Sequence, residues 1–188
     1  MRIILASQSL LRRKALDILG LKYKIKPSNV NEKAIRDSNP MVLAKKLAEI
    51  KALEAGKSEV DAIIISGDLF VVFNDTIYEK PKDKKEAINM LKAFSGNKLE
   101  IVAGIAVYNT ETKKILSASD TFSVKFRNLL DYEIEDYVSR YPVLRYAAAF
   151  EGDGLMRFGE STQGSYPFLY GLPMNYLISF LRENSIKV

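Results

Sequence analysis

The 188-residue chain contains no cysteine and no histidine. Their absence excludes disulfides, zinc sites, thiol nucleophiles and imidazole bases. Acid–base chemistry must come from carboxylates, lysines, tyrosines and hydroxyls, and a metal bound by carboxylates would be a hard ion such as Mg²⁺ or Mn²⁺. The chain also lacks the run of about twenty apolar residues that spans a membrane, and its N-terminus shows no signal-peptide pattern. We therefore expect a cytoplasmic protein with no membrane partner.

Composition and charge point to a folded domain with a small anionic ligand. Hydrophobic residues make up 47% of the chain and charged residues 27%, which is typical of a globular protein, and we expect a single domain over residues 1–188. The net charge of +5 favours an anionic partner. Basic residues are scattered among acidic ones, as in residues 82–86, and aromatic residues do not alternate with them. A small polyanion therefore fits better than a nucleic acid.

Strand-like and helix-like segments alternate along the chain, which predicts an α/β fold. The expected strands cover residues 3–6, 22–26, 61–66, 69–73, 99–108 and 115–126. The expected helices follow residue 9 and cover residues 40–56, 84–94, 130–140 and 173–183, with Gly56 closing the helix that starts at residue 40. Residues 141–171 are interpreted as loops with short strands. The long strands predict a mixed, twisted sheet flanked by helices, with two lobes around a central cleft.

The first helix carries its charges in an unusual place. Ser7-Gln8-Ser9 supplies N-cap chemistry, and Arg12 and Arg13 follow in the first turns. Arginines oppose the positive end of the helix macrodipole. An anion held by free backbone N–H groups, the hydroxyls of Ser7 and Ser9 and an arginine would reverse that penalty. The alternative is a solvated basic face of the helix.

Three more charged residues are candidates for the same chemistry. Asp68 is expected just past the carboxyl end of an apolar strand, where α/β sheets place ligand-binding residues, although a turn aspartate is the alternative. Lys51 lies on the apolar face of the helix 40–56, where it either delivers an ammonium into a sheltered site or extends along the surface to water. Lys80 precedes Pro81, which would stiffen its placement.

These motifs occur in a specific order, and in that order the chain resembles the Maf family of nucleoside triphosphate pyrophosphatases along nearly its whole length. The order is LASQS at residues 5–9 with the arginine-bearing helix, Glu32, Lys51, Gly67-Asp68, Lys80-Pro81, residues 95–97, residues 147–150 and Gly171-Leu172-Pro173. The resemblance implies an elongated α/β fold with a central cleft, a divalent metal, Mg²⁺ or Mn²⁺, and cleavage of a nucleoside triphosphate to monophosphate and pyrophosphate. It leaves a family-like homodimer open.

The resemblance also assigns roles to single residues. Ser9, Arg12, Lys51 and Lys80 match positions that bind the phosphates, Glu32 and Asp68 match acidic positions for the metal, and Asp68 matches the proposed general base. Positioning and electrostatic stabilisation suffice for such a reaction, so no covalent nucleophile is needed. The chain departs from the family pattern by Leu11 in place of a first arginine, Leu69 in place of threonine or glutamine, and Ala148 in place of glycine.

The segment Phe150–Leu155 carries the expectation for the substrate. It reads FEGDGL, with Asp153 where the branch that resembles 7-methyl-GTP pyrophosphatases has a glutamate. A carboxylate accepts hydrogen bonds from guanine N1–H and N2–H₂, and it attracts a cationic methylated ring. We therefore expect 7-methyl-GTP as the substrate. The alternatives are that Asp153 only caps an Asp-Gly turn, that the enzyme is a dTTP/UTP pyrophosphatase, or that the protein senses nucleotides without catalysis.

Overall fold

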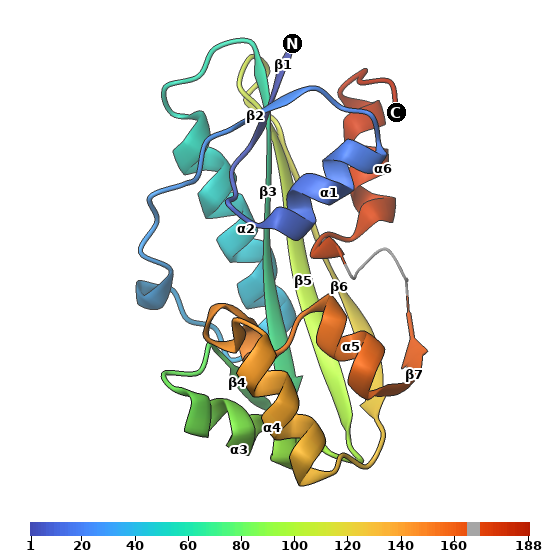
Figure 1. Ribbon diagram of the computed structural model, residues 1–188. Coiled ribbons are helices and arrows are strands. Elements are labelled where there is room, and N and C mark those ends of the chain that lie inside the picture. Colours follow the sequence, from blue (N-terminus) through green and yellow to red (C-terminus); the bar gives the residue numbers. More distant parts are fainter. Residues whose placement is uncertain (165–169) are drawn as a thin grey trace. The chain divides into compact units, whose positions relative to one another are not determined.

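A mixed sheet of seven strands runs through the residues described by the computed structural model, 1–164 and 170–188 (Figure 1). The strand order is β2-β1-β3-β5-β6-β7, with β4 paired to β3 outside this order. The strands are β1 (Arg2–Leu5), β2 (Tyr23–Ile25), β3 (Ala62–Phe73), β4 (Thr76–Tyr78), β5 (Lys98–Asn109), β6 (Ile115–Phe126) and β7 (Gly159–Gln163). The helices are α1 (Leu10–Ile18), α2 (Pro40–Gly56), α3 (Lys84–Phe94), α4 (Asp131–Arg140), α5 (Gly152–Phe158) and α6 (Met174–Glu183). The predicted α/β class with a mixed sheet is confirmed, because β1 pairs in parallel with β2 and β3 while β7 pairs antiparallel with β6.

The chain divides into two compact units, and each is described here by itself. The first contains Met1–Leu69, Val102–Asp120 and the C-terminal segment with α6. The second contains Phe70–Ile101 and Thr121–Gly164. Strands β3, β5 and β6 each contribute residues to both units. No helix among residues 1–164 and 170–188 is long and apolar enough to cross a membrane.

In the first unit, the alternation of side chains along β1 and β3 builds two apolar layers. Ile3 and Leu5 pair in register with Ile63 and Ile65, and these side chains pack with α1 and α6. The side chains between them, Ile4 and Ile64 among others, point to the opposite face and pack against alanines of α2. Side chains of successive strand residues point to opposite faces, so an all-apolar strand needs cover on both.

Helix α2 packs unusually close to the sheet. A Cβ on Gly104 of β5 would overlap the backbone carbonyl of Ala44 in α2. The buried Ser66 hydroxyl of β3 also donates a hydrogen bond to the Ala48 carbonyl at 2.5 Å. Helix α2 ends at Gly56 as predicted, and close packing gives a further reason for a glycine there. It is the last helical residue, and a Cβ there would lie 2.8 Å from the Tyr108 ring, so the position requires a small residue.

The second unit has a core of aromatic side chains. Neighbouring rings have centroids between 4.8 and 6.4 Å apart, and most meet edge to face, as in Phe73, Phe94, Phe126, Phe150, Phe158 and Tyr137. Such pairs contribute about 0.5–1.5 kcal/mol each beyond their burial. The rings come from β3, α3, β6, α4, α5 and the loop before α5, so the cluster holds these elements together.

Two expectations about local structure were wrong. Strand β3 does not end before Gly67-Asp68 but continues to Phe73, so Asp68 lies inside a twelve-residue strand. The second half of β3 has its own partner, because a turn with positive φ at Asn74 and Asp75 folds β4 back onto it. Residues 152–158, expected within a loop region, form the helix α5. Elsewhere the agreement is close: α2, α3 and β6 have the predicted bounds.

Candidate active site

The loop between β1 and α1 is organised by serine hydroxyls. Ser9 is the N-cap residue of α1, and its hydroxyl accepts a hydrogen bond from the Arg12 amide at 3.4 Å. The buried Ser7 hydroxyl accepts one from the Ser9 amide at 3.2 Å. The helix therefore begins with its amides and two hydroxyls gathered on one loop, which is the arrangement that favours an anion.

Arg12 turns back over this loop instead of extending into water. Its Nη1 donates to the Ser7 hydroxyl at 3.0 Å, and its Nε donates to the Gly171 carbonyl at 3.1 Å. Gly171 has a φ of +71°, a conformation that glycine adopts without strain. Arg13, by contrast, bonds the Gln8 carbonyl of its own loop at 3.3 Å. The two adjacent arginines are therefore placed differently, and Arg12 joins the N-terminal loop to the C-terminal one.

A buried lysine joins two carboxylates in the same unit. Lys51 of α2 and Asp68 of β3 have side chains only 8% exposed, and Lys51 Nζ lies 2.5 Å from Asp68 Oδ1. The same Nζ lies 2.9 Å from Oε1 of Glu32, which lies in the short 3₁₀ helix Glu32–Ala34 and is half exposed. The other oxygen of Asp68, Oδ2, is buried and has no hydrogen-bond partner among the described residues. A buried carboxylate oxygen without a partner is costly, so it points to a ligand that this chain alone does not supply.

The pKa shifts show that these charges act on one another. Burial raises the pKa of Asp68, against the opposing effects of Lys51 and Arg12. Loss of hydration lowers the pKa of Arg12, and the negative charges of Asp68 and Glu32 oppose that shift. A carboxylate with a raised pKa beside cationic groups is typical of a site that transfers protons or binds ions.

The structure brings six of the predicted residues together in the first unit and leaves two in the second. The six are Ser7, Ser9, Arg12, Glu32, Lys51 and Asp68. In the second unit, Lys80 is exposed after β4 and has no ion pair within the described chain, while Asp153 is exposed in the first turn of α5. The Asp-Gly turn that was the alternative for Asp153 is thus the start of a helix.

One feature of this site was missed by reasoning from the sequence. The Arg12 side chain donates a hydrogen bond to the Gly171 carbonyl, which is 159 residues away in the sequence. The sequence signal that could have pointed to this contact is the GLP motif at residues 171–173. In the second unit, the backbone at Ala148 has a φ of +54°, a left-handed conformation that strains an alanine. Its amide donates to the Glu79 carbonyl at 3.0 Å, next to Lys80. A glycine, which the family pattern has there, would adopt this conformation freely.

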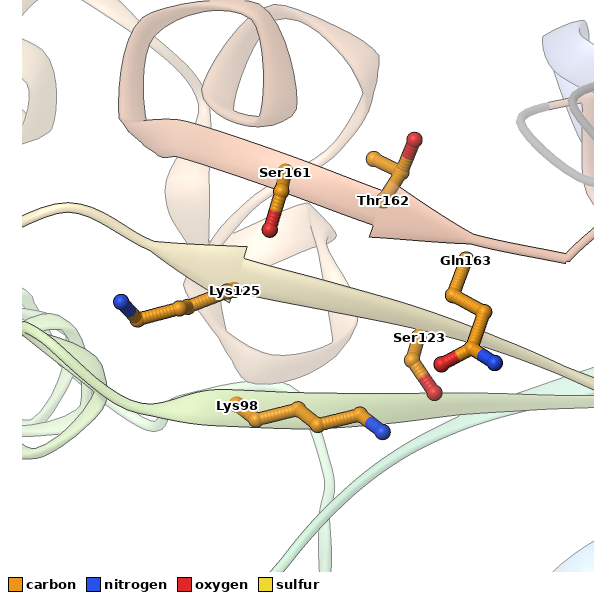
Figure 2. Close-up of a pocket in the computed structure, with 6 residues that line it drawn as sticks. All are labelled: Lys98, Ser123, Lys125, Ser161, Thr162 and Gln163. Atoms are coloured by element: carbon orange, nitrogen blue, oxygen red, sulfur yellow. The ribbon is translucent and has the colours of Figure 1, made fainter.

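A cavity in the second unit is separate from these residues. It has a volume of about 430 Å³ and is lined by side chains of β5, β6 and β7, namely Lys98, Ser123, Lys125, Ser161, Thr162 and Gln163 (Figure 2). Lys125 is paired with Glu160 at 3.0 Å. None of these six side chains is a carboxylate that could serve as a base, so the cavity offers no candidate for the chemistry.

The acidic residues of the site, Asp68 and Glu32, decide which kind of metal ion could bind there. The described part of the chain gathers no group of three or more carboxylate, histidine or cysteine side chains. Mg²⁺ is ordinarily held by one or two carboxylates together with water and substrate phosphates. Asp68, with its unpartnered Oδ2, and the half-exposed Glu32 fit such an ion, whereas they do not fit zinc or an all-protein cage.

Fold and site together define an α/β protein in which a helix start bearing serines and an arginine lies in the same unit as a buried lysine–aspartate pair. Residues 2–184 match the family model described as "Maf-like protein", and the chain belongs to the Maf family. The resemblance noted from the sequence is therefore confirmed.

The relatives carry two different names. A dTTP/UTP pyrophosphatase of Aquifex aeolicus (strain VF5) is 37% identical over 187 residues, which cover 97% of this chain and 95% of the relative. A 7-methyl-GTP pyrophosphatase of Pseudoalteromonas translucida (strain TAC 125) is 32% identical over 188 residues, which cover 99% of this chain and 93% of that relative. Both matches span nearly the full length, so neither name is favoured by coverage.

Solved structures with the same fold have much lower sequence identity. The Staphylococcus aureus Ham1 protein aligns with a TM-score of 0.56 and 16% identity over 98% of this chain and 100% of that chain. A HAM1 protein from Coxiella burnetii aligns with a TM-score of 0.51 and 17% identity over 97% and 99% of the two chains. At these identities the likeness shows the fold alone.

Proposed function

We propose that this protein hydrolyses a nucleoside triphosphate to its monophosphate and pyrophosphate. The observation that carries the proposal is the buried Lys51–Asp68 pair, electrostatically coupled to Arg12 at the start of α1. Membership of the Maf family supports it, and so do relatives named as pyrophosphatases. Cations for phosphates and a carboxylate with a raised pKa are the groups that such a reaction requires.

The residues of this chain take distinct roles in the proposed reaction. Water attacks the α-phosphorus, the bond from that phosphorus to the oxygen shared with the β-phosphorus breaks, and pyrophosphate leaves with that oxygen. Asp68 accepts the proton of the water. Arg12, with Ser7 and Ser9, holds phosphate oxygens at the start of α1, and Lys80 is proposed as a further phosphate contact. Lys51 keeps Asp68 oriented and opposes the effect of burial on its pKa. The phosphate contact that the family resemblance implies for Lys51 is kept as part of the proposal.

A divalent ion is proposed as the cofactor. Asp68 and Glu32 would hold Mg²⁺ or Mn²⁺, and the bound ion would withdraw charge from phosphate oxygens. We expect activity to be lost when EDTA removes divalent ions and to return when Mg²⁺ or Mn²⁺ is added. Full activity in excess chelator would contradict this cofactor.

The decisive experiment on catalysis replaces the carboxylate at Asp68. Asp68→Asn should remain folded and lose at least about 10²-fold of its pyrophosphate release, because an amide neither accepts the proton nor binds the ion as an anion. Asp61→Asn is the matched control. It makes the same chemical change at an exposed residue just before β3, where the φ of +52° suits asparagine. Near-wild-type release from Asp68→Asn would remove Asp68 from this role, and no release from wild type would favour a nucleotide-sensing protein.

For the substrate we propose 7-methyl-GTP, or at least a guanine nucleotide. The support is Asp153, an exposed carboxylate on α5 whose acceptors suit the donors of a guanine edge and the positive charge of its methylated ring. The second candidate is dTTP or UTP, which is favoured by the relative at 37% identity.

The two substrate candidates differ in the expected order of kcat/KM. Measured under one metal condition, kcat/KM should be highest for 7-methyl-GTP, then GTP, and lower for dTTP and UTP. Asp153→Asn should reduce the preference. A clear preference for dTTP or UTP would overturn the substrate while leaving the proposed pyrophosphatase activity in place.

A further inference from the structure

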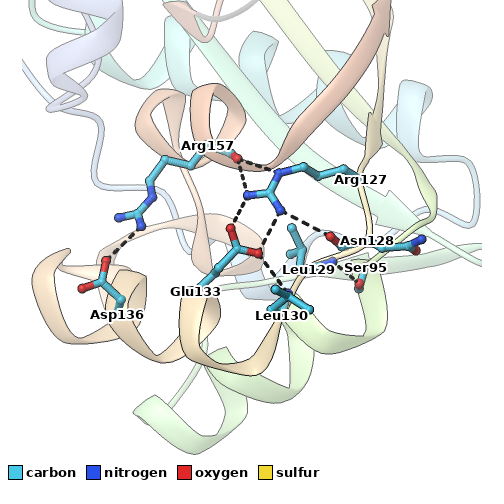
Figure 3. A network of polar contacts seen from close by, with 8 residues as sticks. All are labelled: Ser95, Arg127, Asn128, Leu129, Leu130, Glu133, Asp136 and Arg157. Carbon is cyan, nitrogen blue, oxygen red and sulfur yellow. Dashed lines mark hydrogen bonds and ion pairs between the residues drawn. The ribbon is translucent and has the colours of Figure 1, made fainter.

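Helix α5, which carries Asp153, is tied to α4 by an ion pair near its C-terminal end (Figure 3). Arg157 of α5 donates from Nη2 to Oδ2 of Asp136 in α4 at 2.9 Å. The Arg157 guanidinium also lies over the ring of Tyr137, 5.9 Å from its centroid. One side chain of α5 therefore contacts two successive residues of α4.

A second attachment holds the backbone of α5 at the same residue. Arg127, just after β6, donates from Nε and Nη2 to the Arg157 carbonyl at 3.3 and 3.0 Å. Arg127 is itself fixed by Glu133 of α4 through two contacts of 2.8 and 2.7 Å. This bidentate pair lowers the pKa of Glu133 to about 2. Figure 3 shows both attachments converging on Arg157.

The other end of α5 rests on the ring of Tyr137. A Cβ on Gly154 would lie 2.8 Å from the Tyr137 hydroxyl oxygen and 2.7 Å from Phe150 Cβ, so only glycine permits this approach. Gly154 is the residue directly after Asp153. The backbone that carries Asp153 is thus pressed against α4.

We infer that Arg157 and Asp136 are positioning residues that set the direction of Asp153 and, through it, nucleobase selectivity. The inference rests on the proposed function, in which Asp153 reads the base. Helix α5 has seven residues, and a helix this short is not stable by itself in water, so its orientation depends on such anchors. The Arg157 and Asp136 side chains are about one third exposed, 34% and 31%, and a pair of this kind adds little to global stability. Its contribution is therefore to geometry.

The test is the Arg157→Met variant, which keeps the stem of the side chain and removes the charge. We expect KM for 7-methyl-GTP and GTP to rise about tenfold or more, since displacement of a contact by about 1 Å is enough to cost up to 10²-fold. The kcat and KM for UTP should stay within about twofold. Arg157→Lys, which retains the charge that pairs with Asp136, should restore most of the guanine preference.

Arg140→Met is the matched control. Arg140 donates to the other oxygen of Asp136 at 2.6 Å and lies on α4 itself, so it does not hold α5. This variant should leave the preference unchanged. If Arg157→Met folds poorly by circular dichroism, Asp136→Asn weakens the same ion pair from α4.

Asp153→Asn separates the possible outcomes. If Asp153→Asn lowers the guanine preference and Arg157→Met does not, the positioning role is wrong. An equal loss of kcat on every nucleotide in Arg157→Met would show a merely structural role and would also overturn it. If Asp153→Asn itself leaves the preference unchanged, the base-reading role and this inference fall together, while pyrophosphate release from the wild type still decides the proposed activity.

Discussion

Replacing Lys51 by methionine removes the charge that accompanies Asp68 in the interior. Methionine fills a similar volume on α2, so the main change is electrostatic. The Asp68 carboxylate then stays buried with one fewer cation, and Glu32 loses its partner at a half-exposed position. We expect a large loss of stability from this single substitution.

The burial of both partners sets the size of the effect. Each side chain of the pair is 8% exposed, and breaking a buried ion pair costs about 3–5 kcal/mol. Arg12 still acts on Asp68, which places the expected loss at the lower end, about 3 kcal/mol. For a protein of this length a loss of that size corresponds to a decrease in Tm of about 6–12 °C.

The loss should depend on pH in a defined direction. Burial already raises the pKa of Asp68 above its ordinary value of 3.8, and Lys51 is the strongest opposing influence. Lys51→Met therefore raises the folded-state pKa further. A group whose folded pKa is raised contributes stability that is present below its unfolded pKa and lost as pH rises through the folded value. The deficit of Lys51→Met relative to wild type should be smallest near pH 4 and should grow toward neutral pH.

Urea unfolding between pH 4 and pH 8 measures this prediction. Lys46→Met is the matched control, since it makes the same change at an exposed position of α2 and should have little effect. The double variant Lys51→Met with Asp68→Asn should recover much of the lost stability, because the Asp68 charge is no longer buried without Lys51. The reasoning is refuted if Lys51→Met loses less than about 1 kcal/mol at pH 7, or if the double variant is less stable than Lys51→Met alone.

Three further predictions test local parts of the structure. Arg12→Ala should reduce triphosphate hydrolysis about 10²-fold, far more than Arg13→Ala, because Arg12 joins two loops whereas Arg13 bonds a carbonyl of its own loop. If initial-rate assays gave the reverse order, our alignment of the phosphate loop with the family pattern would be wrong. Gly104→Ala should lower the free energy of unfolding, measured by urea titration, by about 3 kcal/mol, since its methyl group would overlap the backbone of α2. Gly152→Ala is the control and should be nearly neutral, because no atom lies within 4 Å of the new Cβ. Ala148→Val should destabilise the protein by about 2 kcal/mol, because the backbone at this position has a φ of +54°, whereas Ala148→Gly should stay within about 1 kcal/mol of the wild type. If thermal unfolding ranked the two variants the other way, backbone strain at this position would be excluded.

Helix positions could be predicted from the sequence because their ends carry local chemistry. Asn39 caps α2 ahead of Pro40, and the Asp83 side chain accepts from the Glu86 amide at the start of α3. Gly96, with a φ of +69°, follows the end of α3. These signals lie within a few residues of the boundary they mark, so no tertiary information is needed to interpret them.

The missed elements depend on contacts far along the chain. Residues 152–154 read as a turn, because two glycines surround an aspartate, yet they start α5 where Gly154 packs on Tyr137. Likewise, Gly67-Asp68 is typical of the end of a strand in the sequence. In the structure β3 continues through these two residues, because it pairs with neighbouring strands. Local preference for a turn is a weak signal, and tertiary packing overrides it in both places.

The position of Asp68 inside β3 favours a chemical role for this residue over a structural one. For a carboxylate just past the end of a strand, a solvated turn residue is the alternative to a ligand-binding role. Inside β3 it is buried, one of its oxygens has no partner in the described chain, and a lysine must be buried with it. Well-packed apolar residues in place of a buried ion pair are often neutral or stabilising, so stability alone does not account for this pair. Residues that cost folding stability are expected at functional sites. The buried Lys51–Asp68 pair is such a case in the core of the first unit.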